Sequence, residues 1–317
     1  MHKPNLSLMK ITITYCTFFL LLILSACNDR ITDPKVQKKD PDSTLVKKVG
    51  QINRFEIATW NIENFPSDGK TTITTLSQLI LNLDIDLIAF EEIANISAFD
   101  SLLNRLPGWS GYYSPDDYGS SYQKTGFIYK SAFISMSNIK PIFEYDGYAF
   151  PRPPFTAYVQ IKDKTGTVYD FTLIVVHLKA YGGTEEIARR KAACQDLHDY
   201  IDEEISTGAD PDFIVLGDWN DELDDPRSTN VFLPFLDDSL DYSFLTQSIT
   251  NQESYILPPY QGLIDHILIT KDTRQEYGNG LTSVLYLDNE YRNYTNIISD
   301  HRPVMAAFNG ITLDLSF

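Results

Sequence analysis

The chain has 317 residues, of which 43% are hydrophobic and 13% aromatic, and its formal net charge is -17. This composition excludes a globally disordered chain, because it supplies enough apolar surface for a large core. The negative charge excludes a protein that holds nucleic acid through a broad basic surface, but it is compatible with an enzyme that meets phosphates through bound cations.

The N-terminal segment is predicted to be a targeting signal. Lys3 and Lys10 precede an apolar run over residues 11–24 that is too short for a comfortable membrane span. The run ends in LSAC, which closes on Cys27 and resembles the lipobox of bacterial lipoproteins. This resemblance implies that residues 1–26 are removed, that Cys27 carries lipid, and that the chain is exported and anchored to the cell envelope, with the outer membrane favoured. An ordinary signal peptide is the alternative, and it also implies export.

The rest of the chain is predicted to be a tether and one domain. Residues 27–50 are polar, carry Pro34 and Pro41 and show no periodicity, which is typical of a flexible tether. Residues 51–317 contain no second linker or repeat and are interpreted as one domain. Cys194 would be the one cysteine left beyond Cys27, so we expect a buried thiol and no intrachain disulfide.

Apolar runs and helical patterns alternate along this domain. The predicted strands cover residues 55–61, 86–91, 109–115, 123–130, 133–146, 155–163, 168–177, 212–217, 263–270, 282–287 and 303–308. The predicted helices cover residues 71–83, 97–106 and 184–206, and residues 221–260 are expected to be rich in loops. Two sheets with helices on their outer faces account for this order, so the predicted class is α+β.

Polar side chains stand at the ends of several of these apolar strands. They are Asn61, Glu92, His177, Asp218 with Asn220, and Asp300 with His301. Carboxylates, amides and imidazoles are costly to bury and are easily directed into a shared cleft from a strand end. The pattern predicts one catalytic site assembled from the whole length of the domain.

The residue types suggest acid–base and cation chemistry. Asp218 and Asn220 are two residues apart and point the same way on an extended backbone, where they can hold a hard cation or a phosphate oxygen, or else form an Asx turn. His301 suits proton transfer and needs an orienting carboxylate, for which Asp265 is the candidate because it interrupts an apolar strand. The neighbouring His266 is interpreted as structural.

Glu92 is expected to face the pocket and bind a cation, because it follows a buried run. Strand alternation points Glu91 the opposite way, so it is left out of the site. Glu63 lies two residues after Asn61 and is a weaker candidate to support the site.

Six motifs stand in the order found in the endonuclease/exonuclease/phosphatase superfamily. They are TWNI at 59–62, DLIAFEE at 86–92, VH at 176–177, GDWN at 217–220, IDH at 264–266 and SDHRPV at 299–304. The resemblance implies a four-layer αββα sandwich that hydrolyses phosphoesters with Mg²⁺, or with Mn²⁺ or Ca²⁺ in its place. By position it implies that Glu92, Asn61 and Asp300 form the metal site and that Asp218 and Asn220 position water and phosphate. It also implies that His301, oriented by Asp265, acts at the scissile phosphate.

Two further stretches resemble the deoxyribonuclease-I-like branch, in which His177 is the second histidine. SYQK at 121–124 is similar to a stretch whose Tyr contacts phosphate, which implies that role for Tyr122. RPPF at 152–155 is similar to a segment whose Arg contacts the DNA backbone, which implies that role for Arg152. Lys124 stands where those enzymes carry the Glu partner of the second His, and it is predicted to contact a phosphate instead.

The leading hypothesis is therefore a monomeric, lipid-anchored endonuclease that cuts DNA with little sequence preference. One alternative is a phosphodiesterase or phosphatase acting on lipids or inositol phosphates, similar to sphingomyelinases. A second alternative is a surface binding module that has lost the chemistry.

Overall fold

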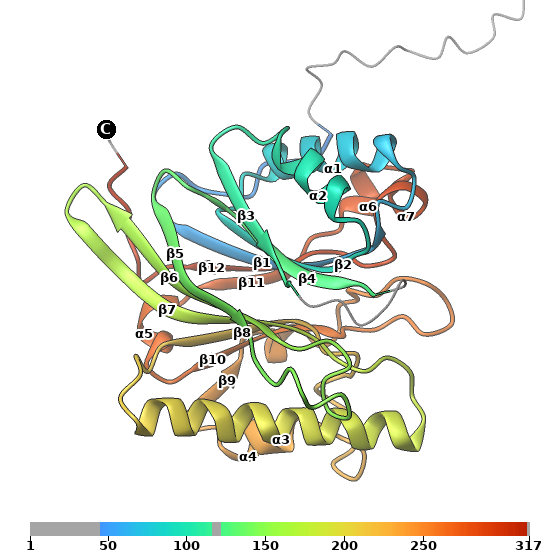
Figure 1. The fold of residues 1–317 in the computed structure, drawn as a ribbon, viewed down its shortest axis with the longest axis vertical. Helices are drawn as coiled ribbons and strands as arrows, with labels where there is room; N and C mark the ends of the chain where they lie inside the picture. Colours follow the sequence, from blue (N-terminus) through green and yellow to red (C-terminus); the bar gives the residue numbers. More distant parts are fainter. Residues whose placement is uncertain (1–44, 116–121, 316–317) are drawn as a thin grey trace, which may run out of the picture. The chain divides into compact units, whose positions relative to one another are not determined.

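The computed structural model describes residues 45–115 and 122–315 (Figure 1). These residues belong to one compact unit, Thr44–Phe317. The predicted signal segment, the predicted lipidation site Cys27 and most of the predicted tether lie outside the described residues. No helix in the described part of the chain has the length and apolar character that a membrane crossing requires.

Residues 45–50, which the sequence assigns to the tether, pack against the domain. Val46 is buried beside helix α1 (Lys70–Leu83). The Leu45 N–H donates to Asn82 Oδ1 at 2.6 Å, and the Gly50 N–H donates to the Leu83 carbonyl at 2.9 Å. The polar composition of the whole segment concealed the short apolar run that anchors its end, so the domain begins before residue 51.

The first sheet has six strands in the order β11-β12-β1-β2-β4-β3. In chain order they are β1 (Phe55–Phe65), β2 (Leu87–Ile93), β3 (Trp109–Tyr113), β4 (Lys124–Lys130), β11 (Leu281–Val284) and β12 (Val304–Phe308). Strands β1 and β2 run parallel and the other neighbours run antiparallel, so the sheet is mixed.

The second sheet has six strands in the order β5-β6-β7-β8-β10-β9. They are β5 (Ile134–Pro141), β6 (Phe155–Asp163), β7 (Gly166–His177), β8 (Phe213–Asp218), β9 (Tyr242–Phe244) and β10 (Asp265–Thr270). Strands β7 and β8 are parallel and the other pairs are antiparallel, so this sheet is mixed as well.

Helices cover the outer face of each sheet (Figure 1). On the first sheet these are α1, α2 (Ile96–Leu103), α6 (Leu287–Glu290) and α7 (Tyr294–Ile297), and on the second they are α3 (Thr184–Ser206) and α4 (Leu233–Asp237). The short helices η1 (Leu245–Ile249) and α5 (Thr273–Tyr277) complete the described elements. The predicted four-layer αββα sandwich is confirmed.

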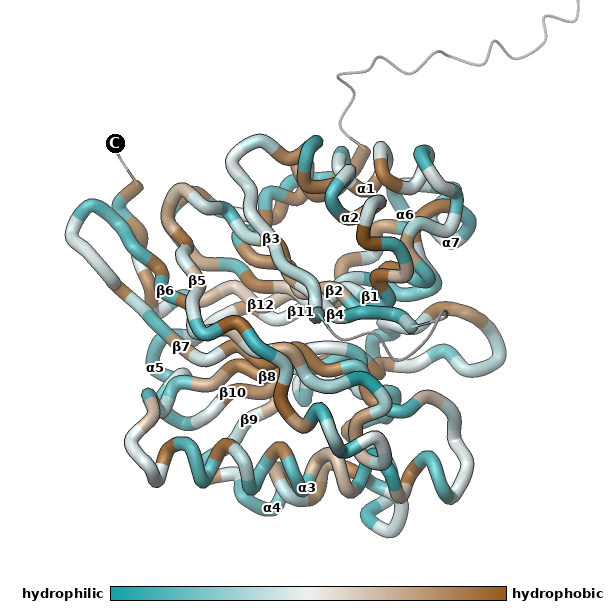
Figure 2. The backbone as a smooth tube through the Cα atoms, viewed as in Figure 1, coloured by the Kyte–Doolittle hydropathy of each residue, from teal (hydrophilic) through white to brown (hydrophobic). Residues whose placement is uncertain are grey.

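Three apolar clusters hold the layers together. One lies between the sheets, where Phe127 of β4 stacks on Phe155 of β6 with ring centroids 5.2 Å apart. A second lies under α1 and α2, and a third lies under α3 and contains the buried thiol of Cys194, as predicted. Figure 2 shows apolar positions concentrated along the central strands, whereas α3 alternates between apolar and polar positions.

One local prediction is corrected by the structure. The strand expected at 133–146 ends at Pro141, which has no N–H to donate to a further ladder bond. The stretch 221–260 is rich in loops, as expected, and also contains the short elements α4, β9 and η1. These elements span only three to five residues each, which is too short for a periodic pattern to be recognised.

The strand registers bring the polar strand ends to one edge of the sandwich. In the second sheet, His177 is opposite Asp218, and Asp218 is opposite Asp265. In the first sheet, Asn61 is opposite Glu91, and the register shifts just beyond this pair. The irregularity gives Glu92 a φ of 65° and turns its side chain out of regular strand alternation.

Candidate active site

His301 and Asp265 form the hydrogen-bonded pair that the sequence suggested. His301 Nδ1 lies 2.8 Å from Asp265 Oδ2, and both side chains are buried. The Ser299 hydroxyl accepts the His301 N–H at 2.9 Å and donates to the Asn61 carbonyl at 2.6 Å, which ties this loop to the end of β1. Because Asp265 occupies Nδ1, Nε2 is the ring atom left for other partners, and it lies 3.8 Å from Asp218 Oδ2.

The surroundings of His301 favour its charged form. Burial acts to lower the pKa of His301, but the negative charges of Asp265 and Asp218 outweigh it and raise the pKa to about 10. At neutral pH the ring is therefore an imidazolium ion, which can donate a hydrogen bond from Nε2.

Carboxylates and one amide from both sheets gather next to this histidine. The Asn61 amide donates to Asp218 Oδ2 at 3.0 Å and to Glu92 Oε1 at 3.3 Å, so it bridges the two sheets. The Asp300 N–H donates to Glu63 Oε2 at 3.1 Å. The structure thus assembles Asn61, Glu92, Asp218 and Asp300, and it adds Glu63, which the sequence suggested only weakly.

This donor set fits a hard divalent cation. Burial, followed by repulsion from Asp265, raises the pKa of Asp218 to about 7. Burial, reinforced by the charge of Glu92, raises the pKa of Asp300. A cation among these oxygens would relieve the repulsion, and carboxylate and amide oxygens are its preferred ligands. Asp218, Asp265 and His301 also offer three ligand atoms within 4.8 Å of one another, but Asp265 and His301 are already bonded to each other.

His177 lies at the same edge without the carboxylate partner expected of a general acid. Its Nε2 is 3.6 Å from Asp218 Oδ2 and 4.0 Å from Glu92 Oε1, and its Nδ1 has no hydrogen-bond partner among the described residues. Burial, with the charges of Arg152 and His301, holds the pKa of His177 well below its usual range. The ring is therefore neutral at ordinary pH.

Gln123, which the sequence did not single out, connects the carboxylate cluster to the basic side of the site. Its amide nitrogen donates to Glu92 Oε2 at 2.8 Å, and its carbonyl oxygen accepts from Arg152 at 2.7 Å. Tyr122 and Arg152 line the cavity, whereas Lys124 is not among its lining residues. Lys124 Nζ lies 5.3 Å from the centre of the Tyr122 ring.

A buried ion pair holds the loops on the second sheet's side. Arg190 Nε bonds to Asp221 Oδ2 at 2.9 Å, and its Nη1 donates to the carbonyls of Lys179 and Tyr181 at 2.7 Å each. The Asn220 amide donates to the Leu178 carbonyl at 3.3 Å, so it too helps to fix this loop. Arg190 lies on the buried face of α3, and a charged residue at that helical spacing was the sequence signal that could have revealed it.

Glu91 corrects the expectation that it lies away from the site. It is fully buried, and its Oε1 accepts a hydrogen bond from the Thr59 hydroxyl at 3.0 Å. Burial, followed by the charges of Asp265 and Asp218, raises the pKa of Glu91 well above its usual range. Glu91 therefore lies directly behind the site rather than away from it.

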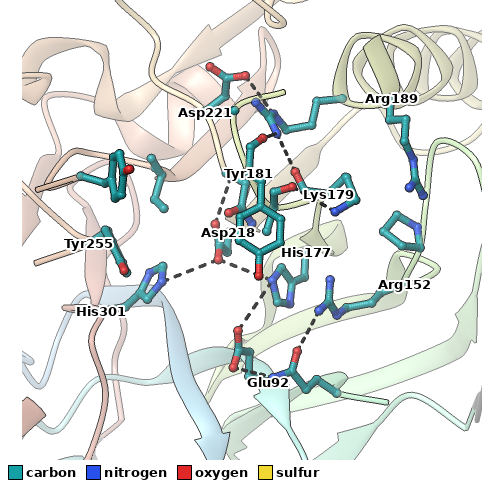
Figure 3. Close-up of a pocket in the computed structure, with 18 of the residues that line it drawn as sticks. Glu92, Arg152, His177, Lys179, Tyr181, Arg189, Asp218, Asp221, Tyr255 and His301 are labelled. Carbon is teal, nitrogen blue, oxygen red and sulfur yellow. Dashed lines mark hydrogen bonds and ion pairs between the residues drawn. The ribbon is translucent and has the colours of Figure 1, made fainter. Parts of the chain in front are cut away.

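A cavity of about 1390 Å³ is lined by several of the site's side chains, among them Glu92, His177, Asp218, Asp300 and His301. In Figure 3, Arg152 and Arg189 lie on the side opposite His301 and Tyr255, with Asp218 and His177 between them. The floor of the cavity is acidic and can hold a cation, and hydrogen-bond donors lie on two of its walls. It suits a reaction in which negative charge builds up on a bound phosphate.

Comparison with known proteins agrees with this chemistry. The model of the Endonuclease/Exonuclease/phosphatase family matches residues 58–301. A search of curated protein sequences gives no significant match. Solved structures with a similar fold include the human Nocturnin catalytic domain, with 19% identity, a TM-score of 0.59, and coverage of 81% of this chain and 94% of that one.

Two other similar structures differ in what they act on or bind. The mannosyl-6-phosphatase of Bacteroides thetaiotaomicron has 17% identity and a TM-score of 0.57, with 80% of this chain and 98% of that chain covered. TDP2 of D. rerio, complexed with a single-strand DNA product, has 13% identity and a TM-score of 0.58, with 81% and 99% covered. At these identities the structures establish a shared fold, and the family match establishes the membership: the chain belongs to the endonuclease/exonuclease/phosphatase family and is a phosphoester hydrolase.

Proposed function

We propose that the chain is an exported, Mg²⁺-dependent endonuclease that cuts DNA with little sequence preference. The observation that carries this proposal is the wide cavity with acidic residues on its floor and Arg152, Lys179 and Arg189 in its lining. An open cavity of about 1390 Å³ accommodates a polymer on both sides of a scissile phosphate. The acidic chain otherwise has little to attract a polyanion, so the bound cation and these side chains supply the attraction.

The cation would be held by Glu92, Asn61 and Asp300. When bound, it polarises the phosphate and favours deprotonation of the attacking water. Asp218 and Asn220 orient that water, whose oxygen forms the new bond to phosphorus while the bond to the leaving oxygen breaks.

The remaining side chains act on the phosphate and its neighbours. His301, fixed through Nδ1 by Asp265, donates from Nε2 to the charge that develops on the phosphate. The neutral His177 adds an N–H donor on the floor. Arg152, oriented by Gln123, grips a neighbouring phosphate together with Tyr122, since a guanidinium matches phosphate geometry.

Export and anchoring belong to the same proposal. We assign residues 1–26 as a lipoprotein signal, Cys27 as the lipidated residue and the outer membrane as the destination. A Cys27→Ser variant is expected to lose metabolic labelling by a fatty acid and to leave the membrane fraction. Unchanged labelling of that variant would contradict the assignment.

The nuclease proposal is tested by incubating the purified full chain with supercoiled plasmid and Mg²⁺, Mn²⁺ or Ca²⁺, with and without chelator. Nicking that depends on the cation and is lost in Glu92→Gln supports it. The control is Asp237→Asn, an exposed carboxylate that pairs with Arg227 outside the cavity. Absence of nicking with all three ions would refute the proposal.

A second candidate is a phosphatase or a lipid-directed phosphodiesterase. The similarity to a mannosyl-6-phosphatase fold favours keeping a phosphomonoester in the assay. Hexose 6-phosphate, an inositol phosphate and sphingomyelin vesicles are therefore run beside the plasmid. Turnover of one of these with an intact plasmid would reassign the substrate while leaving the roles of Glu92 and His301 in place.

A further inference from the structure

Exposed tyrosines flank the catalytic cavity. Tyr181 and Tyr260 are each 79% exposed, and both line the cavity together with Tyr255. The Tyr255 ring lies 5.1 Å from the His301 ring, in an edge-on arrangement. Large aromatic faces left open to water beside a site are available for a flat ligand.

Backbone contacts hold the loop that carries Tyr181. The Tyr181 carbonyl is one of the two acceptors of the buried Arg190, which is itself paired with Asp221. Its backbone has a φ of 79°, a left-handed conformation that costs free energy in a residue other than glycine. Lys179 Nζ lies 4.9 Å from the centre of its ring. The loop backbone is therefore held in place, and it presents an exposed aromatic ring with a cation beside it.

The opposite wall is set by the loop before β10. The Tyr255 backbone pairs with Gly262 and with His301, so the position of this wall depends on the catalytic loop itself. The Tyr260 N–H donates to the Leu257 carbonyl at 3.2 Å, which closes a tight turn at the cavity rim. The loop with Tyr255 and Tyr260 is thus tied through its backbone to His301.

Charge limits how a nucleic acid can be held here. Among the described residues, the Arg and Lys side chains that line the cavity are Arg152, Lys179, Arg189 and Arg190, and the last of these is paired with Asp221. A protein that binds duplex DNA mainly through the DNA phosphates makes about 6–10 such contacts. Three cations cannot supply that number on a chain with a net charge of -17. Base–aromatic stacking is the sequence-tolerant alternative, and it needs bases that are unpaired.

We propose that the site takes single-stranded nucleic acid, with unpaired bases next to the scissile phosphate stacked on Tyr181 and Tyr260. This rests on the proposed nuclease function and specifies its substrate. The cations contact backbone phosphates while the tyrosines stack on bases, with Lys179 beside the Tyr181 ring. A duplex enters only where its strands separate, as they do at fraying ends or locally in a negatively supercoiled plasmid.

The test compares single-stranded and blunt duplex oligonucleotides of the same sequence, with the full chain and Mg²⁺. We expect kcat/KM to be at least about tenfold higher for the single strand. Tyr181→Ala and Tyr260→Ala should each raise KM about tenfold with little change in kcat, while Tyr181→Phe and Tyr260→Phe stay near wild type. Tyr145→Ala, which removes a fully exposed tyrosine that does not line the cavity, should leave both constants unchanged.

A single strand with abasic sites on both sides of the cut separates stacking from a structural role. Its KM should not respond to Tyr181→Ala, because no base remains to stack. Equal cleavage of duplex and single strand, or alanine variants with the wild-type KM, overturns the inference while the nuclease function stands. If neither oligonucleotide is cut but hexose 6-phosphate is hydrolysed, both proposals fail.

Discussion

Replacing Asp265 by Asn is expected to lower kcat about 10²–10⁴-fold with KM within about threefold of wild type. Asp265 is fully buried and accepts the His301 Nδ1–H at 2.8 Å. A hydrogen bond to a charged group contributes about 1.5–3 kcal/mol, which corresponds to about 10–150-fold in rate. An Asn amide can also donate to Nδ1 and select the wrong tautomer of His301, an effect that reaches about 10⁴-fold at a catalytic imidazole.

The assay is hydrolysis of bis(p-nitrophenyl) phosphate, which reports the chemical step without a polymer substrate. Asp237→Asn is the matched control, because it makes the same change at an exposed ion pair. Circular dichroism and thermal melting check that the Asp265→Asn variant is folded. A folded variant whose kcat stays within about threefold of wild type would show that the buried charge behind His301 does not serve the reaction.

Three further predictions concern stability and the cation. Burial and the charge of Asp86 raise the pKa of Glu56 to about 8. Protonated Glu56 therefore makes its full contribution to the free energy of unfolding below about pH 4.5, and this contribution is lost as pH rises through about 8. Between these pH values the unfolding free energy of wild type should therefore fall by up to about 1.4 kcal/mol per pH unit more steeply than that of Glu56→Gln. Urea melts in which the two proteins show the same pH dependence would contradict this. Arg190→Met should cost about 3–5 kcal/mol in urea denaturation, because Asp221 loses its buried partner; a loss under about 1 kcal/mol would count against it. Mg²⁺ at about 100 times its Kd should stabilise wild type by about 2.7 kcal/mol but not Glu92→Gln; equal shifts in calorimetry would place the ion elsewhere.

Much of the site could be predicted because its residues end buried strands. His177 and Asp218 each follow a run of apolar residues, where a polar side chain is costly unless it is used. The parallel pairing of β7 with β8 then places the two side by side. Asp265 interrupts an apolar strand for the same reason. Local sequence was therefore sufficient to predict where these strands lie and which polar residues end them.

The parts that could not be predicted depend on irregular backbone and on distant contacts. Period-two alternation continues through Glu91, which faces the space between the sheets as Leu87 and Ala89 do. It fails at Glu92, where the register shift turns the side chain. Gln123 acquires its role from Glu92 and Arg152, which lie far from it in the chain. A pattern of residue types does not encode such contacts, so it contained no signal for Gln123.

The Asn61 amide, which bridges Glu92 of one sheet and Asp218 of the other, ties catalysis to the alignment of the two halves of the sandwich. Sliding one sheet past the other by a single ångström would break this bridge while leaving every ladder within each sheet intact. On heating, hydrolysis should therefore fade before far-ultraviolet ellipticity does. The rate of hydrolysis therefore reports how well the two sheets remain aligned with each other.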